Sequence, residues 1–297
     1  MRRLRPVFWC VIVMLMVLGL GCRDSRRSDV AGLPKTPGEG KAVAPVSSVK
    51  AAEPLSPVVP QKPKQLPPAT VAAKKTTDKI VIDGKLDEQT WQQAQRLPIE
   101  FIHNTGTKTT AGGFGRMAWD DDSFYIAFEL TDTDIQAQGD TRDNCNINPP
   151  NDVVEVFIDI NNDDEHFIEL HLNALNGFND IFIVRPRKES PLYNRSPYHL
   201  FFLNGWNLAD YQTAVQVSGT ANNAQDQDKG WTAEIRLPFK SLMMPAGQQA
   251  AKPGDVWRVQ LVDQNGGAKD RYLEWSPNYE AWFHHAISNW GRVEFAQ

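Results

Sequence analysis

V-V-E-V-F-I-D at residues 153–159 and F-I-E-L-H-L-N at residues 167–173 both alternate apolar and polar residues. Side chains two apart share one face of a β-strand, so each run predicts a strand with one apolar and one polar face. The apolar faces hold Val154, Val156, Ile158, Ile168, Leu170 and Leu172, and the polar faces hold Glu155, Asp159, Glu169, His171 and Asn173. These two strands set the pattern for the rest of the domain.

Similar short segments recur between turn signals on both sides of this pair. Alternation or β-rich composition predicts strands at residues 80–82, 124–130, 181–185, 213–217, 231–237, 257–261 and 292–295. Short helices are expected only at residues 88–95 and directly after Pro238. Many short strands with Gly-, Asn- and Asp-rich turns predict an all-β, antiparallel β-sandwich of the immunoglobulin or jelly-roll kind.

The polar strand faces are the first place to look for function. If their strands are neighbours, one polar surface collects Glu155, Glu169, His171, Asn173, Arg258 and Gln260. The alternative is that these side chains simply meet water, because antiparallel sheets can leave one face solvated.

Charge divides the chain at Asp78. Residues 1–78 carry 13 Lys and Arg against 5 Asp and Glu, whereas residues 79–297 carry 18 against 31, a net charge of −13. So acidic a domain repels a phosphate backbone, which excludes nucleic acid as an expected partner. Eight of the nine Trp also lie in residues 79–297, enough apolar mass for one folded domain.

The first 22 residues are predicted to be an export signal. Arg2, Arg3 and Arg5 precede an apolar run at residues 7–20, which as a helix of about 21 Å is too short for a bilayer core of about 30 Å. Cys22 follows directly, a placement that resembles a bacterial lipoprotein signal with Cys22 as the lipidated residue. The protein is then exported and lipid-anchored to the cell envelope. An ordinary cleaved signal or a short anchor is the alternative.

Residues 23–78 are predicted to be a disordered tether. They contain nine Pro and no aromatic residue, and they show no helical or strand periodicity. Cys10 would leave with the signal, so Cys145 is the one thiol of the folded part and no disulfide within it is expected.

Eight motifs in order carry a family resemblance across residues 79–297. They are I-D-G-K-L-D-E-Q-T-W (82–91), R-M-A-W-D-D-D-S-F-Y-I-A (116–127), D-V-V-E-V-F-I-D (152–159), E-L-H-L-N-A-L-N (169–176), L-N-G-W (203–206), G-W-T-A-E-I-R-L-P-F (230–239), P-G-D-V-W-R-V (253–259) and W-G-R-V-E-F (290–295). This series resembles the family 9 carbohydrate-binding modules. The resemblance implies a β-sandwich that binds sugars reversibly, often appended to secreted polysaccharide-degrading enzymes.

The resemblance also implies sugar contacts. Members hold a terminal sugar between two Trp rings, and one of these maps to Trp275 in L-E-W-S-P. The Glu of D-x-V-E maps to Glu155 as a hydroxyl acceptor, with His171 and Asn173 on the same face. The second ring position holds Pro149, so Trp282 or Phe178 would have to replace it.

Other readings remain open at this point. Asp159, Asn161, Asp163, Asp164 and Glu165 crowd one turn and offer oxygen ligands, so structural calcium is the alternative to no cofactor and no metal. A glycoside hydrolase would use Glu155 and Glu169 as its carboxylate pair. A haem-binding relative would use Met117 and His171 as ligands. A degenerate sugar fold would serve scaffolding or adhesion.

Overall fold

A computed structural model describes residues 65–195, 199–203, 205–242, 250–268, 271–280 and 283–297. The predicted signal with Cys22, and the tether up to residue 64, lie outside these ranges. Within them, no helix has the length and apolar character needed to cross a lipid bilayer.

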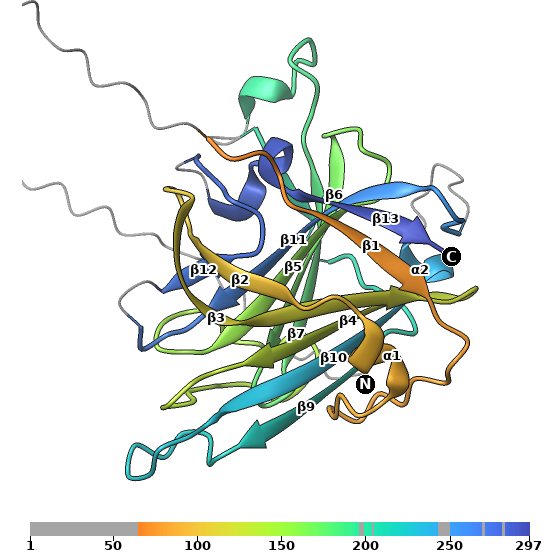
Figure 1. Ribbon diagram of the computed structural model, residues 1–297. Helices are drawn as coiled ribbons and strands as arrows, with labels where there is room; N and C mark the ends of the chain where they lie inside the picture. Colours follow the sequence, from red (N-terminus) through yellow and green to blue (C-terminus); the bar gives the residue numbers. More distant parts are fainter. Residues whose placement is uncertain (1–64, 196–198, 204, 243–249, 269–270, 281–282) are drawn as a thin grey trace, which may run out of the picture. The chain divides into compact units, whose positions relative to one another are not determined.

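Strands dominate the described chain (Figure 1). They are β1 (Thr70–Lys75), β2 (Leu97–Ile102), β3 (Thr107–Trp119), β4 (Ser123–Leu130), β5 (Val153–Asp159), β6 (His166–Asn173), β7 (Phe178–Val184), β8 (Phe201–Leu203), β9 (Gln212–Ser218), β10 (Gly230–Pro238), β11 (Val256–Gln264), β12 (Tyr272–Glu274) and β13 (Gly291–Ala296). The helices are short: α1 (Gln89–Gln93), α2 (Phe239–Leu242), and the 3-10 turns η1 (Tyr193–Arg195), η2 (Phe283–His285) and η3 (Ile287–Asn289).

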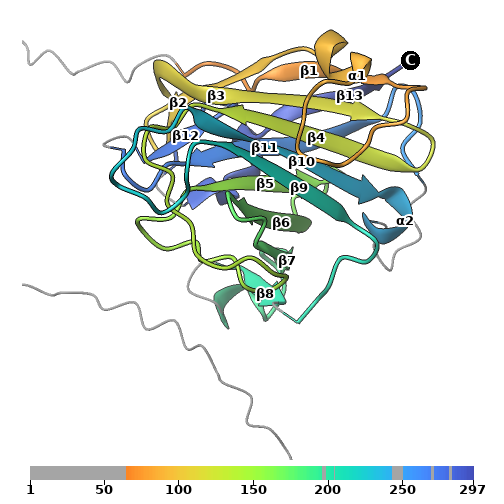
Figure 2. The ribbon, with the colours of Figure 1, turned by 90° about the horizontal axis from the view of Figure 1, so that it is seen from below.

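The strands form one continuous sheet that folds over into two layers. Its order is β8-β7-β6-β5-β11-β12-β2-β3-β4-β10-β9, and every pair along this path is antiparallel. The short β12–β2 pairing lies between one layer containing β5 to β8 and another containing β3, β4, β10 and β9 (Figure 2). β1 runs parallel to both β13 and β3, which links the layers a second time. The predicted all-β sandwich is therefore confirmed.

The main core fills the space between the layers. From β5 it receives Val154, Val156 and Ile158, none of them exposed, and from β4 it receives Phe124, Ile126 and Phe128. Trp119, Trp231 and Trp257 also belong to it, and the last two start the predicted strands 231–237 and 257–261. Because the apolar face of β5 and β6 is used here, their polar residues must face away from this core.

A second cluster covers the outer face of β3 and β4. Trp91 of α1 is 1% exposed and donates from Nε1 to Glu234 Oε1 at 2.8 Å. The other Glu234 oxygen accepts the backbone N–H groups of Asp83 and Gly84. Glu234 thus holds the I-D-G-K-L-D-E-Q-T-W motif against the sheet. The predicted strand at residues 80–82 is wrong, because this segment packs as irregular chain with Ile80 in the cluster.

The predicted end of the tether at Asp78 is too late. β1 lies inside it and pairs with β13 from Thr70 to Lys74. Val71 and Ala73 point into the main core while their neighbours are exposed. This short alternation was hidden by the Pro- and Lys-rich composition around it.

Candidate functional site

The predicted polar surface exists on the side of β5 and β6 that faces away from the main core. Glu155 lies opposite His171 in the strand register, and Val262 and Glu274 continue the same row across β11 and β12. Glu169 lies two residues before His171 in β6, so it shares the same face. The strands therefore bring together side chains that are far apart in the sequence.

A segment that follows β12 covers this surface. Ile287 and Trp290 pack on Phe157, Phe167 and Val262 and form a third apolar cluster, separate from the main core and from the cluster around Trp91. As a result Glu155 is only 6% exposed and His171 only 2% exposed. These predicted sugar contacts lie beneath the covering segment rather than on open surface.

The covering segment also brings histidines to the buried carboxylates. Glu274 Oε1 lies 2.5 Å from His284 Nδ1 and 3.1 Å from His103 Nδ1. On its other side, His284 Nε2 lies 3.7 Å from Glu155 Oε2. Burial by itself would lower the pKa of His284, but the charges of Glu155 and Glu274 outweigh it and raise that pKa. Glu274, His284 and Glu155 thus form one continuous buried ion-pair network.

Glu169 is the centre of a second group of ion pairs. Its Oε1 lies 2.9 Å from His171 Nε2, and its Oε2 lies 2.8 Å from His285 Nε2. Burial alone would raise the pKa of Glu169, but the hydrogen bonds from the two histidines hold it well below its ordinary range. Glu169 is therefore ionised at neutral pH and acts as an acceptor for both rings.

Trp275 does not have the exposure expected of a stacking ring. It is 4% exposed and belongs to the main core. Its six-membered ring presses on Gly291 so closely that a Cβ added there would lie 2.3 Å from Cζ3. The expectation failed because the chain after β12 turns inward, so a residue after a strand end became core.

The side-chain amide of Asn173 makes all its hydrogen bonds inside the protein. Its amide nitrogen donates to the Gln138 and Gly139 carbonyls, and its Oδ1 accepts the N–H groups of Leu175 and Gly177. An amide has two donors and two acceptor sites, so all of them are used. Asn173 holds the loop before β5 and offers no free group to a sugar.

A hollow of about 490 Å³ opens beside this surface, at the His285 end. It is lined by charged and aromatic side chains, which include Asp163, Asp164, Glu165, Arg185, Arg187, Lys188, Glu189, Tyr193, His199, Glu280 and His285. Phe202 of β8 lies next to it, with its ring 5.8 Å from that of His285. Phe202 is 42% exposed, so part of its side chain is open to solvent beside His285, which lines the hollow.

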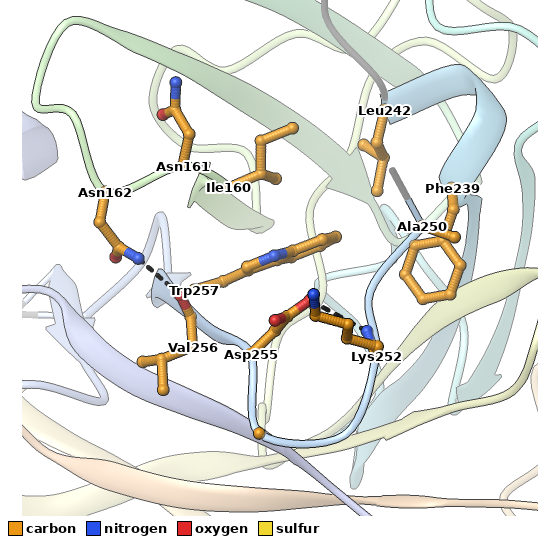
Figure 3. A pocket seen from close by; sticks show the side chains of 11 residues that line it. Ile160, Asn161, Asn162, Phe239, Leu242, Ala250, Lys252, Asp255, Val256 and Trp257 are labelled. Atoms are coloured by element: carbon orange, nitrogen blue, oxygen red, sulfur yellow. Dashed lines mark hydrogen bonds between the residues drawn. The ribbon is translucent and has the colours of Figure 1, made fainter. Parts of the chain in front are cut away.

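Another hollow, of about 660 Å³, lies at the end of the sandwich beside Trp257. Ile160, Phe239 and Leu242 surround the Trp257 ring (Figure 3). Asn162 donates its side-chain amide to the Val256 carbonyl, and Asp255 accepts the Lys252 N–H, so polar groups at its rim are already paired. Its wall mixes apolar side chains with Asn161, Asn162, Lys252 and Asp255, and no histidine is among the described residues that line it.

The acidic turn after β5 uses its oxygens internally. Asp163 Oδ1 accepts the N–H groups of Glu165 and His166, and Asp163 Oδ2 lies 3.0 Å from His166 Nδ1. Burial raises the pKa of Asp159 to about 6. Calcium at this turn stays a prediction.

The two chemical alternatives receive no geometric support. Met117 lies in the main core, whereas His171 points from the opposite face of the layer that bounds this core, so they cannot ligate one haem. In a glycoside hydrolase both carboxyl groups must reach the scissile bond. Glu155 and Glu169 are both buried under the covering segment.

Sequence analysis missed His103, His284, His285, Glu274 and Phe202. The three histidines lie in loops or a 3-10 turn, where no periodicity indicates which way a side chain points. Phe202 lies in a three-residue edge strand, too short for alternation to be read. The adjacent pair at 284–285 was the one available signal.

Comparisons with known proteins agree with this architecture. The family described as "Carbohydrate family 9 binding domain-like" matches residues 82–297. No curated protein sequence matches the chain. Among solved structures, a putative carbohydrate-binding protein from Bacteroides uniformis is similar, with a TM-score of 0.54, 12% identity, and coverage of 76% of this chain and 99% of that one.

Two further similar structures are a family 9 carbohydrate-binding module from Caldicellulosiruptor kristjanssonii, solved with cellotriose or with glucose. The cellotriose complex has a TM-score of 0.48 at 16% identity and covers 76% of this chain and 93% of that one. The glucose complex has a TM-score of 0.47 at 14% identity and covers 76% and 97%. Because the family match spans most of the folded region in one piece, this chain belongs to the carbohydrate family 9 binding domain-like family.

Proposed function

We propose that residues 65–297 form a non-catalytic domain that binds a sugar or oligosaccharide reversibly. The observation that carries this proposal is the family match over residues 82–297. It is supported by a hollow with many hydrogen-bonding groups in its wall and by the 42% exposed Phe202, whose ring lies beside the lining residue His285. Sugars need both kinds of contact, because their C–H faces are apolar and their hydroxyls require partners once water is displaced.

In this proposal Phe202 is the stacking platform. Its ring lies beside that of His285, which lines the hollow, and the hydroxyls of a sugar resting on it would meet Arg185, Glu280 and His285 in the wall. Glu155 and His171 lie under the covering segment and do not reach the hollow. Glu155 pairs with His284, and Glu169 pairs with both His171 and His285. They would then orient the covering segment rather than touch the sugar.

The charge of the hollow favours a neutral ligand. Its wall contains five carboxylates (Asp163, Asp164, Glu165, Glu189 and Glu280) against three cations (Arg185, Arg187 and Lys188). An acidic sugar would meet net repulsion there, since like charges at an interface disfavour a ligand. Neutral sugars are therefore the expected class.

Replacing Phe202 with alanine is expected to weaken sugar binding roughly tenfold. Burying a Phe side chain stabilises by about 1.5–3 kcal/mol, and a partial loss of this contact corresponds to about one order of magnitude in affinity. Calorimetric titration of the full chain measures it. Val81→Ala is the control, because Val81 is 52% exposed on a segment that packs on the other layer. Equal affinities for parent and Phe202→Ala would reject this location.

We also propose that the domain is exported and tethered to the cell envelope through lipid on Cys22. Replacing Cys22 with alanine is expected to move the protein from the membrane fraction to the soluble fraction or to leave its signal unprocessed. Cys10→Ala is the matched control, because Cys10 lies inside the apolar run. If Cys22→Ala is processed and partitions like the parent, an ordinary signal or short anchor replaces the lipoprotein proposal.

A scaffolding or adhesion role is the second candidate. The observation that favours it is the burial of Glu155, His171 and Trp275, together with Pro149 at the place of a second stacking ring. A sugar fold that has lost its open site would look like this and would bind no glycan.

A further inference from the structure

We propose that His103, Glu274 and His284 form a binding site for a divalent transition metal, with Zn²⁺ as the expected ion. The proposal is independent of sugar binding, since none of the three residues is placed against the sugar. The ion would fasten the covering segment that carries His284 to the sheet.

The three side chains come from separate parts of the chain and meet at one point. His103 follows β2, Glu274 ends β12, and His284 belongs to η2. Their ligand atoms all lie within 4.8 Å of one another. His103 is held in place by its backbone N–H, which donates to the Tyr272 carbonyl of β12. The sheet therefore positions His103 and Glu274 before any ion binds, whereas His284 is supplied by η2.

The hydrogen bonds to the Glu274 carboxylate are unevenly divided between its two oxygens. Both Nδ1 atoms point to the same oxygen, Glu274 Oε1, at 3.1 Å and 2.5 Å, and Asn278 also donates to it at 3.3 Å. Glu274 Oε2 has no hydrogen-bond partner, although Glu274 is completely buried. A buried carboxylate oxygen left unpaired is costly. A cation that Glu274 binds through both of its oxygens would satisfy Oε2 as well as Oε1.

The distances suit a first-row ion. Two ligands at about 2.0–2.1 Å in a tetrahedral site lie roughly 3.3 Å apart. The distance from His103 Nδ1 to Glu274 Oε1, 3.1 Å, is already close to this value. His284 Nδ1, at 2.5 Å from the same oxygen, would have to move slightly away from it. Two imidazoles with one carboxylate favour zinc and its neighbours over Ca²⁺ or Mg²⁺, which take oxygen ligands.

A second carboxylate completes the arrangement. Glu155 Oε2 lies 3.7 Å from His284 Nε2, which favours a proton on Nε2 and leaves Nδ1 as the nitrogen that would exchange its proton for the metal. Metal-binding histidines usually have such a carboxylate behind them. The His103 side chain is 11% exposed, which gives an ion a way in from solvent.

The test is calorimetric titration of the chelator-treated full chain with Zn²⁺, with circular dichroism to check folding. We expect one zinc per chain, and His103→Ala and Glu274→Gln should each lower its affinity by more than the roughly 10–100-fold typical of outer-shell changes. His166→Ala is the control, because His166 belongs to the separate cluster with Asp163 and Glu165. Absence of zinc binding, unchanged binding by both site variants, or loss of binding in His166→Ala would overturn the proposal.

A measurement on the parent protein guards against variants that fail to fold. Co²⁺ in a low-symmetry site with two imidazoles and a carboxylate gives visible absorption bands that the hexaaqua ion lacks. We expect these bands to appear on saturating the full chain with Co²⁺ and to disappear when Zn²⁺ is added. A spectrum that stays that of the free ion would also overturn the proposal.

Discussion

Trp275→Ala is expected to lower the free energy of unfolding by about 3–5 kcal/mol, the usual cost of removing a large buried aromatic side chain. The Trp275 ring is 4% exposed, lies in the main core and fits against Gly291 without space for a Cβ. Gly291 cannot fill the space left by the ring, because it has no side chain and its strand, β13, is paired on both sides, with β1 and β11. Urea denaturation of the variant and parent measures the difference.

Phe202→Ala is the matched control for this experiment. Phe202 is 42% exposed, so its removal should change stability by less than about 1 kcal/mol. The two aromatic residues thus have opposite expected roles, with Trp275 stabilising the fold and Phe202 serving the ligand. A Trp275→Ala variant that keeps its stability but loses sugar binding would restore Trp275 as the stacking ring.

Asp263→Asn is expected to stabilise the protein at pH 8 by on the order of 4 kcal/mol. Asp263 is 5% exposed, and burial, together with the charges of Asp132 and Asp152, raises its pKa to about 7. Its ordinary pKa is 3.8. Each unit of difference corresponds to about 1.4 kcal/mol of stability, and an asparagine amide carries no charge that burial could penalise.

The pH dependence has a definite sign. Below about pH 4 the Asp263 carboxyl is protonated in both the folded and the unfolded chain, so it costs nothing. Between about pH 4 and 7 only the unfolded chain ionises, and stability falls as the pH rises; above about pH 7 the loss is complete. The stability gained by Asp263→Asn should therefore grow from pH 4 to 7 and then level off.

Chemical denaturation between pH 4 and 8, with a chelator present, measures this gain. Asp228→Asn is the control, because both Asp228 oxygens accept backbone N–H groups, from Ile135 and Thr220. That variant should lose stability, since an amide cannot accept both bonds. An Asp263→Asn variant that is no more stable than the parent at pH 8 would contradict the claim that burial raises the pKa of Asp263 and destabilises its ionised form.

Alternation made part of this fold predictable. β5 begins and ends at the residues that the pattern indicates, because one of its faces is wholly apolar. β3 was missed although it is the longest described strand. Its Gly113 and Gly115 allow close approach of Leu130 and Leu261, so the core-facing positions carry no side chain and the apolar pattern disappears.

The candidate site was predictable only to the same extent. The shared face of Glu155, Glu169 and His171 follows from the period of two and from the pairing of β5 with β6. What covers that face does not follow from local pattern, because η2 and η3 reach it from a distant part of the sequence. Hence the sequence indicated that Glu155 and Glu169 line the surface, but it indicated neither Glu274 nor the segment that buries all three.

The central claim is that this domain binds neutral sugars, and calorimetric titration of the full-length chain with a panel of neutral mono- and oligosaccharides tests it most directly. A single exposed ring beside a polar hollow predicts reversible binding in the millimolar to high-micromolar range, roughly −4 to −6 kcal/mol, for at least one of them. Absence of binding across the panel, by a chain that circular dichroism shows to be folded, would contradict the claim and favour the scaffolding role.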